Sequence, residues 1–284
     1  MIDGILVVNK PKDYTSRDVV NKVSKILKTK KIGHTGTLDP IASGVLVLTV
    51  GRATKLSEVL TSEEKKYTAT AILGIQTDTL DTEGVILKEE YVKISKEEII
   101  DTLNSFKKTY DQQVPIYSAV KINGKKLYEY ARNNEEVDLP SREVTIKEIE
   151  LLDIKYENNK TIIRFSCLVS KGTYIRSLIR DIANSLNTVG IMSDLIRTKQ
   201  GNFDINDSYT IEQIENNEFE FIKLEDALSE YYTVDMDNDL EFKVKNGVIL
   251  KDTYHQDYVL FKSNNILALY KKEKDKLKPF KMFV

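Results

Sequence analysis

One glycine-rich segment with a single aspartate is the part of the sequence best suited to chemistry. It runs Lys31-Ile-Gly-His-Thr-Gly-Thr-Leu-Asp-Pro-Ile-Ala-Ser-Gly44. Glycines permit sharp backbone turns, and Pro40 restricts the preceding Asp39 to an extended conformation. A carboxylate held in this way between two strands is placed to act on a bound molecule, although a glycine-rich loop with one Asp is often only a turn.

Other chemistries that this segment could carry lack their partners. The Gly-Lys-Ser/Thr end of a Walker phosphate loop is absent, and His34 has no serine in a GxSxG context. The acids between Asp78 and Glu83 do not have the spacing of a calcium loop. One cysteine and two histidines cannot make a Cys/His zinc site. We therefore expect an ionised carboxylate that works with no metal and no organic cofactor.

Charge is distributed unevenly along a chain whose net charge is −2. Basic residues crowd the stretches 22–31 and 121–132, whereas acids dominate from Asp204 to Glu241, where Lys223 is the only Lys or Arg. This asymmetry allows an anion-binding face on a mildly acidic protein, although either basic cluster could equally be a solvated helix face.

The sequence predicts a soluble, cytoplasmic protein. No run of about 18 apolar residues is present, and the first residues carry no basic segment of the kind that opens a signal peptide. Cys167 is the only cysteine, so an internal disulfide is impossible and a reducing compartment is favoured. Strand alternation places Cys167 in the core rather than in a nucleophilic site.

The elements that must position Asp39 follow from apolar periodicity and capping signals. Gly4 to Asn9 and Val45 to Val50 are expected to be buried strands, with a helix capped by Ser16 between them. Beyond these we expect the strands Tyr67–Ile75, Val144–Leu152 and Thr161–Val169, and helices that begin near Ser95, Tyr174 and Thr210.

Length favours one large domain followed by a smaller one. Residues 112–140 are rich in Tyr, Lys and Asn and look like an excursion from the core. After about Tyr231 the chain consists of short strand-like runs, the last of them Phe280 to Val284. We predict an α+β fold with a mixed sheet and helices in residues 1–230, and a small β domain in residues 231–284.

An ordered set of motifs across roughly residues 4–203 resembles TruB-type pseudouridine synthases closely. The motifs are Asn9-Lys-Pro11, GHTGTLDPIASGVL from Gly33, Gly51-Arg-Ala-Thr-Lys55, Lys65-Lys-Tyr67, Thr77-Asp-Thr-Leu-Asp81, Tyr117-Ser-Ala-Val-Lys121, Gly124-Lys-Lys-Leu-Tyr128 and Ser170-Lys-Gly-Thr-Tyr-Ile-Arg176. One of them alone would be weak, but the ordered set is highly specific.

The sequence also departs from the family pattern. Asp13 and Asn187 stand where the family usually has glycine, as does Ala183, while Val114 replaces a proline and Ile196 replaces an arginine. None of these departures touches Asp39, so they bear on RNA contacts and local packing rather than on the reaction.

The resemblance implies a pseudouridine synthase catalytic domain whose insertion, residues 112–140, clamps RNA, followed by a PUA-like RNA-binding β domain. It implies isomerisation of uridine 55 in the T arm of tRNA. The N1–C1′ bond of the uridine would be cleaved, the base rotated, and the ribose rejoined through C5. The target base must leave the RNA stack at a cost of about a few kcal/mol.

Site residues are carried over from the family by matching motifs. Asp39 is implied as the essential carboxylate, Arg176 as the arginine that pairs with it, and Tyr67 as the residue that stacks on the target base and helps to remove the C5 proton. The residues implied to contact the base or the RNA are His34, Asp81, Tyr174, Lys10 and Leu195. Whether Asp39 attacks C1′, attacks C6 or generates a glycal intermediate stays open.

The implied partner is the tRNA T-arm stem-loop, with no guide RNA and no membrane, and we expect a monomer. Three alternatives remain at this stage. The first is a non-catalytic RNA-binding or tRNA-folding module, and the second is a guide-RNA-dependent rRNA synthase. The third is a nucleotide-phosphate binder that uses the loop from Gly33 to Gly44.

Overall fold

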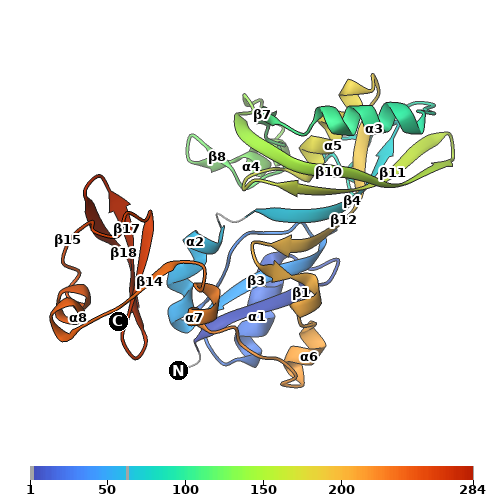
Figure 1. Ribbon diagram of the computed structural model, residues 1–284. Coiled ribbons are helices and arrows are strands. Elements are labelled where there is room, and N and C mark those ends of the chain that lie inside the picture. The colour runs from blue at the N-terminus through green and yellow to red at the C-terminus, as the bar shows by residue number, and fades with distance from the viewer. Residues whose placement is uncertain (1–2, 62–63, 284) are drawn as a thin grey trace.

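A large mixed sheet organises most of the chain. The computed structural model describes residues 3–61 and 64–283, and all structural statements refer to these. The sheet has the order β1-β3-β12-β4-β11-β10-β7, with β2 on β3 and β13 on β12 (Figure 1). Its strands are β1 (Gly4–Lys10), β2 (Ile32–His34), β3 (Ser43–Val50), β4 (Lys65–Leu73), β7 (Thr109–Gln113), β10 (Ser141–Glu157), β11 (Lys160–Val169), β12 (Gly190–Gln200) and β13 (Phe203–Asp204).

Helices cover this sheet in two groups, one for each half. The helices are α1 (Ser16–Ile26), η1 (Gly51–Leu56), α2 (Ser57–Thr61), α3 (Lys96–Ser105), α5 (Ile175–Ser185), η2 (Ile205–Asp207), α6 (Ile211–Glu215) and α7 (Leu224–Ala227). Figure 1 shows α1 and α6 against the half that contains β1 and β3, and α3 and α5 against the half that contains β10 and β11.

The two halves meet at β12. This strand pairs with β4 along most of its length, but with β3 only at Ile196–Ser43 and Arg197–Gly44. We call these two pairs the β3–β12 junction. The Asp39 loop, between β2 and β3, therefore belongs to one half, while β4 and α5 belong to the other.

Each half has an apolar cluster of its own, and Leu38, Ile41 and Ala42 of the Asp39 loop pack into the cluster of the β4–β11 half. Val19, Val20 and Val23 of α1 pack against alternate residues of β1 and β3. In the other half, the inward side of α5 joins the buried face of β4 and β11, where Phe165 and Cys167 alternate with more exposed neighbours. The core position expected for Cys167 is confirmed, and burial raises its pKa to about 12.

Two insertions leave the large sheet. The first is a hairpin of β5 (Ile75–Thr77) and β6 (Ile86–Glu89). The second contains β8 (Lys121–Ile122), β9 (Lys125–Lys126) and α4 (Leu127–Arg132). Its two ends are joined by a 2.9 Å hydrogen bond from the Val114 N–H to the Pro140 carbonyl, which a proline at position 114 could not donate. The structure places Gln112 and Gln113, the first two residues of the expected excursion, in β7.

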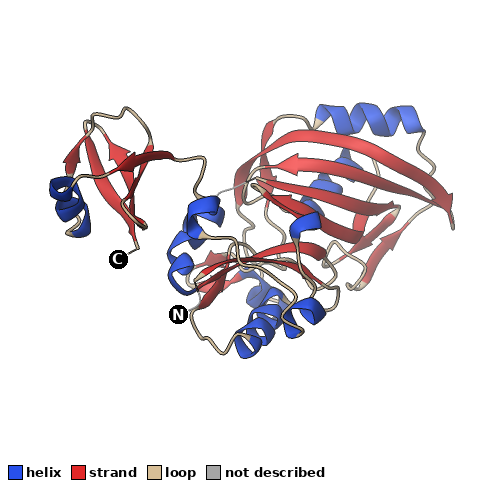
Figure 2. Cartoon of the chain, turned by 60° about the horizontal axis from the view of Figure 1, so that its bottom comes forward, coloured by secondary structure: helices blue, strands red, loops and turns tan. Residues whose placement is uncertain are grey.

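The C-terminal part forms a second sheet, set apart from the large one in Figure 2. Its order is β14-β16-β17-β18-β15. The elements are β14 (Tyr232–Asp235), α8 (Asn238–Lys245), β15 (Leu250–Lys251), β16 (Tyr258–Lys262), β17 (Ile266–Glu273) and β18 (Lys276–Met282). Val284, the end of the last expected run, lies outside the described residues.

The expected capping signals are mostly confirmed. Ser95 with Glu98 and Thr210 with Gln213 form capping boxes. The prediction that Ser16 caps α1 is wrong, because Thr15 and Asp18 form the capping box. Ser16 is instead buried, and its hydroxyl bonds the backbone of Leu38. The segment expected to be loop from residue 33 to residue 40 begins as β2.

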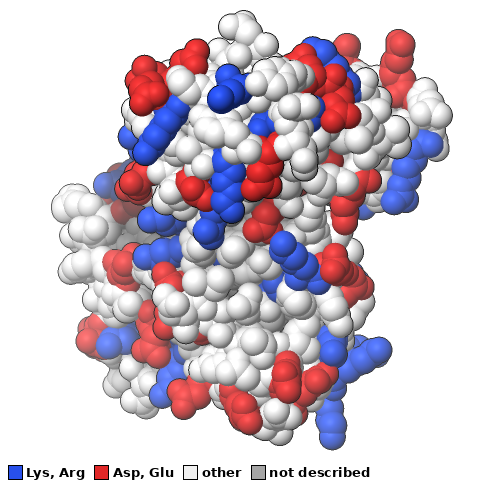
Figure 3. Space-filling model, turned by 90° about the vertical axis from the view of Figure 1, so that its right-hand side faces the viewer, with Lys and Arg blue, Asp and Glu red and all other residues white. Residues whose placement is uncertain are grey.

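Two surface features bear on possible partners. None of the helices in the described residues is long and apolar enough to cross a membrane. On the face turned away from the C-terminal sheet, acidic and basic side chains are intermingled (Figure 3). This face therefore shows no broad patch of one sign.

Candidate active site

Hydrogen bonds from beneath hold the backbone of the Asp39 loop. The Ser16 hydroxyl bonds both the N–H and the carbonyl of Leu38, at 2.8 and 3.2 Å. The Pro40 carbonyl accepts from the Asp13 N–H at 2.9 Å and from Lys10 Nζ at 3.2 Å. Asp13 has φ +65°, the conformation for which the family pattern has glycine. The residues on both sides of Asp39 are thus fixed.

Lys10 does not face the space in front of Asp39. Its side chain is fully buried, and its ammonium also donates to the carbonyls of Pro11 and Tyr14, at 2.9 and 2.5 Å. Burial lowers the Lys10 pKa to about 8, and the charge of Asp39 opposes the fall. Two of these carbonyls lie in the turn after β1, and only that of Pro40 lies in the Asp39 loop, so the ammonium is held within the protein. A contact of Lys10 with RNA stays a prediction.

Arg176, in the first turn of α5, forms a two-point ion pair with Asp39. Arg176 Nε lies 3.0 Å from Asp39 Oδ2, and an η nitrogen donates to Oδ1 at 3.3 Å. The Asp39 side chain is 39% exposed, whereas that of Arg176 is 7% exposed. The carboxylate is therefore oriented by a buried cation while remaining open to a ligand.

Further contacts fix the guanidinium of Arg176. It donates to the carbonyls of Thr79 and Tyr117, at 2.8 and 3.0 Å, and lies 3.7 Å from the buried carboxylate of Asp81. Asp81 is held in turn by the Thr79 hydroxyl and the Glu83 N–H. Asp81 is therefore a second carboxylate beside the Arg176 guanidinium, and unlike Asp39 it is buried.

Tyr67 belongs to the same site through β4. It is paired with Arg197 of β12 on one side and with Cys167 of β11 on the other, and it is 7% exposed. Burial raises the pKa of its phenol, and the charge of the neighbouring Arg197 opposes that rise. At neutral pH Tyr67 is thus a neutral phenol with an aromatic face available to the pocket.

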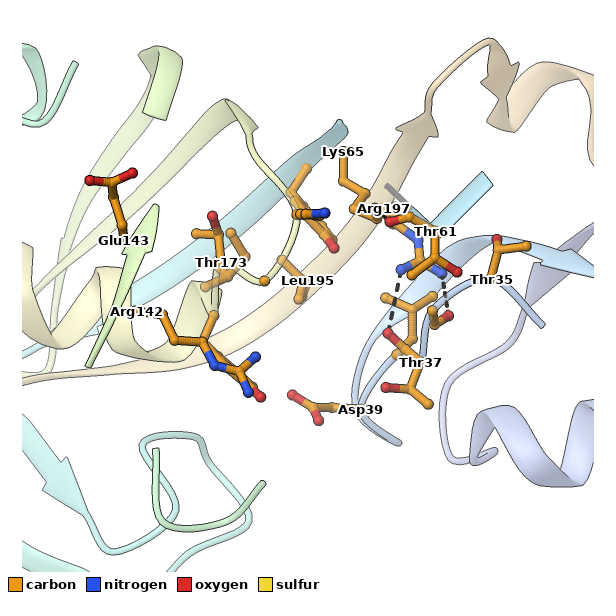
Figure 4. Close-up of a pocket in the computed structure, with 17 residues that line it drawn as sticks. Thr35, Thr37, Asp39, Thr61, Lys65, Arg142, Glu143, Thr173, Leu195 and Arg197 are labelled. Atoms are coloured by element: carbon orange, nitrogen blue, oxygen red, sulfur yellow. Dashed lines mark hydrogen bonds between the residues drawn. The ribbon is translucent and has the colours of Figure 1, made fainter. Parts of the chain in front are cut away.

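Asp39 and Tyr67 open onto a cavity of about 560 Å³. Asp39, Tyr67, Tyr174 and Leu195 line it, together with Arg142 and others. Figure 4 shows Asp39 and Arg142 pointing toward one another, with Arg197 beside Thr37 and Thr61. The further lining residues are Thr35, Gly36, Thr37, Leu38, Thr61, Lys65, Glu143, Lys171, Gly172, Thr173, Ile175 and Arg197.

His34 is placed differently from the residues that line the cavity. It lies in β2, and its Nδ1 accepts a 3.3 Å hydrogen bond from the Gly36 N–H. Burial lowers its pKa, so the ring is neutral at neutral pH. His34 lies next to the lining segment that begins at Thr35 rather than in it.

Sequence reasoning missed two buried residues of this site. Arg197 is 1% exposed, and its guanidinium lies beneath the Asp39 loop. Gln112 is also 1% exposed, and its Oε1 accepts from the Tyr174 N–H at 2.8 Å, at the start of α5. The only available signal was a polar residue at a position where strand alternation points inward.

The donor set does not favour a metal. Among the described residues, no group of three or more His, Cys, Asp or Glu side chains could hold a metal ion. What the site offers is one oriented carboxylate, a buried guanidinium and an aromatic ring. Such a set can stabilise or trap a cationic sugar carbon.

Comparisons with known proteins agree with this chemistry. Residues 24–175 match the family model described as TruB family pseudouridylate synthase, N-terminal domain. Proteins named tRNA pseudouridine synthase B are 42% identical in Bacillus cytotoxicus, covering 100% of this chain and 98% of that protein, and 44% identical in Clostridium tetani, covering 96% and 93%.

The fold also resembles a solved structure entitled "Crystal Structure of a Cbf5-Nop10-Gar1 Complex". The TM-score is 0.75 at 24% sequence identity, over 99% of this chain and 85% of that one. The family model and the full-length relatives lead to one conclusion: the chain belongs to the TruB family of pseudouridylate synthases.

Proposed function

We propose that this protein isomerises uridine to pseudouridine in tRNA, at position 55 of the T arm, without a guide RNA. The observation that carries the proposal is the Asp39–Arg176 pair, half open to a cavity that Tyr67 also lines. The full-length relatives named tRNA pseudouridine synthase B support the choice of tRNA.

The reaction needs no co-reactant, because substrate and product are isomers. The N1–C1′ bond of uridine breaks and a C5–C1′ bond forms, while C5 loses a proton and N1 gains one. An aspartate is ionised at neutral pH and can stabilise or trap the developing cation at C1′. Arg176 holds the carboxylate at two points and aims it at the cavity.

The surroundings suit a base that has left its stack. Tyr67 offers a ring and Leu195 an apolar surface against the base, and both lie at the cavity wall. Arg142 and Lys171 line the same cavity and supply positive charge for the phosphates on either side of the flipped nucleotide. Lys125, Lys126 and Arg132 in the 112–140 insertion each lie over a tyrosine ring and supply further cations for RNA.

The direct test replaces the carboxylate by its amide. We expect Asp39→Asn to form no detectable pseudouridine in unmodified tRNA, while its affinity for tRNA stays within about tenfold of wild type. Nucleoside analysis after incubation, with chemical mapping of the modified position, measures the first quantity. Filter binding measures the second.

Glu143→Gln is the matched control, because Glu143 is an exposed carboxylate that lines the same cavity. It should retain activity. Normal turnover by Asp39→Asn would refute the catalytic assignment. Inactivity of the wild type on a bare T-arm hairpin, in the absence of any other RNA or protein, would refute the stand-alone proposal.

A further inference from the structure

The residues of the proposed reaction come from two halves of the sheet whose strands pair with each other only at the β3–β12 junction. Asp39 follows β2 in one half, whereas Tyr67 on β4 and Arg176 on α5 belong to the other. The junction consists of two paired positions. The packing of Leu38, Ile41 and Ala42 against the β4–β11 half helps to set the distance between Asp39 and its partners, and so do the contacts made at this junction.

The backbone of Arg197 lies at the centre of this junction. It is opposite Gly44 of β3 on one side and opposite Tyr67 of β4 on the other. Gly44 has φ +99°, and a Cβ at that position would lie 2.3 Å from the Arg197 carbonyl oxygen. The two halves thus approach as closely as the backbone allows at the position of Arg197.

The side chain of Arg197 then reaches into the half that carries Asp39. Nε donates to the Val45 carbonyl at 2.6 Å. The two η nitrogens donate to the carbonyls of Gly36 and Thr37, at 3.1 and 3.4 Å (Figure 4). Hydrogen bonds from an ionised donor are stronger than neutral ones, and a planar fork fixes their directions.

We infer that Arg197 is a positioning residue for the reaction, since its guanidinium fixes the backbone just before Asp39 relative to Tyr67 and Arg176. The inference rests on the proposed function. These three hydrogen bonds go to carbonyl oxygens, and the guanidinium is also hydrogen-bonded to the Tyr67 side chain. It therefore acts through the loop and the ring of Tyr67 and needs no contact with RNA. A misplacement of about 1 Å can cost about 100-fold in rate.

The test separates rate from binding. We expect Arg197→Ala to lower the single-turnover rate at saturating tRNA by about 100-fold, and Arg197→Lys by about tenfold, because an ammonium cannot span three separated carbonyls. The tRNA Kd of both should stay within about threefold of wild type. Guanidinium ions added to Arg197→Ala should raise its rate about tenfold, whereas ammonium ions should not.

Lys199→Met is the control, because Lys199 is an exposed cation on the same strand; its rate should equal that of wild type. Thermal unfolding of each variant shows whether it is folded at the assay temperature. A wild-type rate in Arg197→Lys, a loss confined to Kd, or Arg197→Lys unfolded at the assay temperature would each overturn the positioning role. Absence of pseudouridine with the wild type would instead defeat the proposed function itself, and the role of Arg197 with it.

Discussion

The buried Lys10 side chain helps to hold the Asp39 loop in place, and it can do so fully only while it is protonated. An ammonium has three N–H donors, and Lys10 uses them on the carbonyls of Pro11, Tyr14 and Pro40. A neutral amine has only two, so deprotonation leaves one carbonyl without its donor. Loss of one such bond costs about 1 kcal/mol, or about fivefold in rate if it loosens the Asp39 loop.

We therefore expect the single-turnover rate to fall about fivefold above pH 8, since burial lowers the Lys10 pKa to about 8. Stability should move in the other direction. Between pH 8 and the ordinary lysine value of about 10.5, the unfolded state holds a proton that the folded state has released, so the Lys10 contribution to folding stability rises with pH. Rate and denaturation measured over the same pH range check both signs.

Lys10→Met should form pseudouridine more slowly than wild type, and its rate should not fall further above pH 8. In Lys12→Met the rate should still fall above pH 8, because Lys12 is exposed and pairs with Asp194 at the surface. If the rate of Lys10→Met fell above pH 8 as much as that of wild type, another group would be responsible for the pH dependence.

Single residues also show where sequence reasoning stopped. Asp39, Arg176 and Tyr67 were found because their motifs resemble those of a family, and the structure brings them together. The motif around Lys10 indicates that the residue matters but not which way its side chain points, and the structure shows the ammonium bonded to three backbone carbonyls. Arg197 was passed over because its partners, Gly36 and Thr37, lie about 160 residues earlier in the chain.

At the scale of elements, the β3–β12 junction depends on a glycine. An alanine at position 44 would have to adopt φ +99°, and its Cβ would lie 2.3 Å from the Arg197 carbonyl oxygen. Neither strand can move away without breaking the pairing between them. We expect the free energy of unfolding to fall by about 3 kcal/mol or more, with a reduced rate of pseudouridine formation. Urea denaturation and single-turnover assays measure the two effects.

Gly124→Ala is the matched control, because Gly124 has φ +81° but no heavy atom within 4 Å of an added Cβ. It should show only the conformational cost of about 1–2 kcal/mol. If the free energy of unfolding fell equally in the two variants, the close approach at Gly44 would contribute nothing to stability.

Elements were predicted well where the signal is local. Strand alternation in β11 and the capping boxes of α3 and α6 depend on residues a few positions apart, and all are confirmed. The strand order could not be obtained in this way, because β12 lies between β3 and β4 although more than a hundred residues separate it from either. That insertion creates the junction on which the site depends.

At the scale of the whole molecule, the two sheets share an apolar core. Leu260, Ile266, Leu269 and Phe283 from the C-terminal sheet pack with residues of β1, β3 and the helices after β3. An ion pair of 2.6 Å between Lys281 and Glu58 lies beside it. The C-terminal sheet is thus a structural support of the half that carries Asp39, whatever it contributes to RNA binding.

We expect Phe283→Ala to destabilise the whole chain rather than the C-terminal sheet alone. Phe283 is 1% exposed in the shared core, and truncation of a buried phenylalanine costs about 3–5 kcal/mol. The melting temperature should fall by about 10 °C in one cooperative transition, because ~1 kcal/mol corresponds to about 2–4 °C in a chain of this size. Activity below the transition should persist, since Tyr67 and Leu195 belong to a different core.

Phe242→Ala separates this effect from the loss of any aromatic side chain in the C-terminal part, because Phe242 lies in α8. Phe242 is 70% exposed, so its removal should change stability by less than about 0.5 kcal/mol. If Phe283→Ala instead gave two transitions, with only the smaller one shifted, the two sheets would unfold independently. The shared core would then be a contact between two self-sufficient domains, and the Asp39 half would owe its stability to α1, α6 and its own strands.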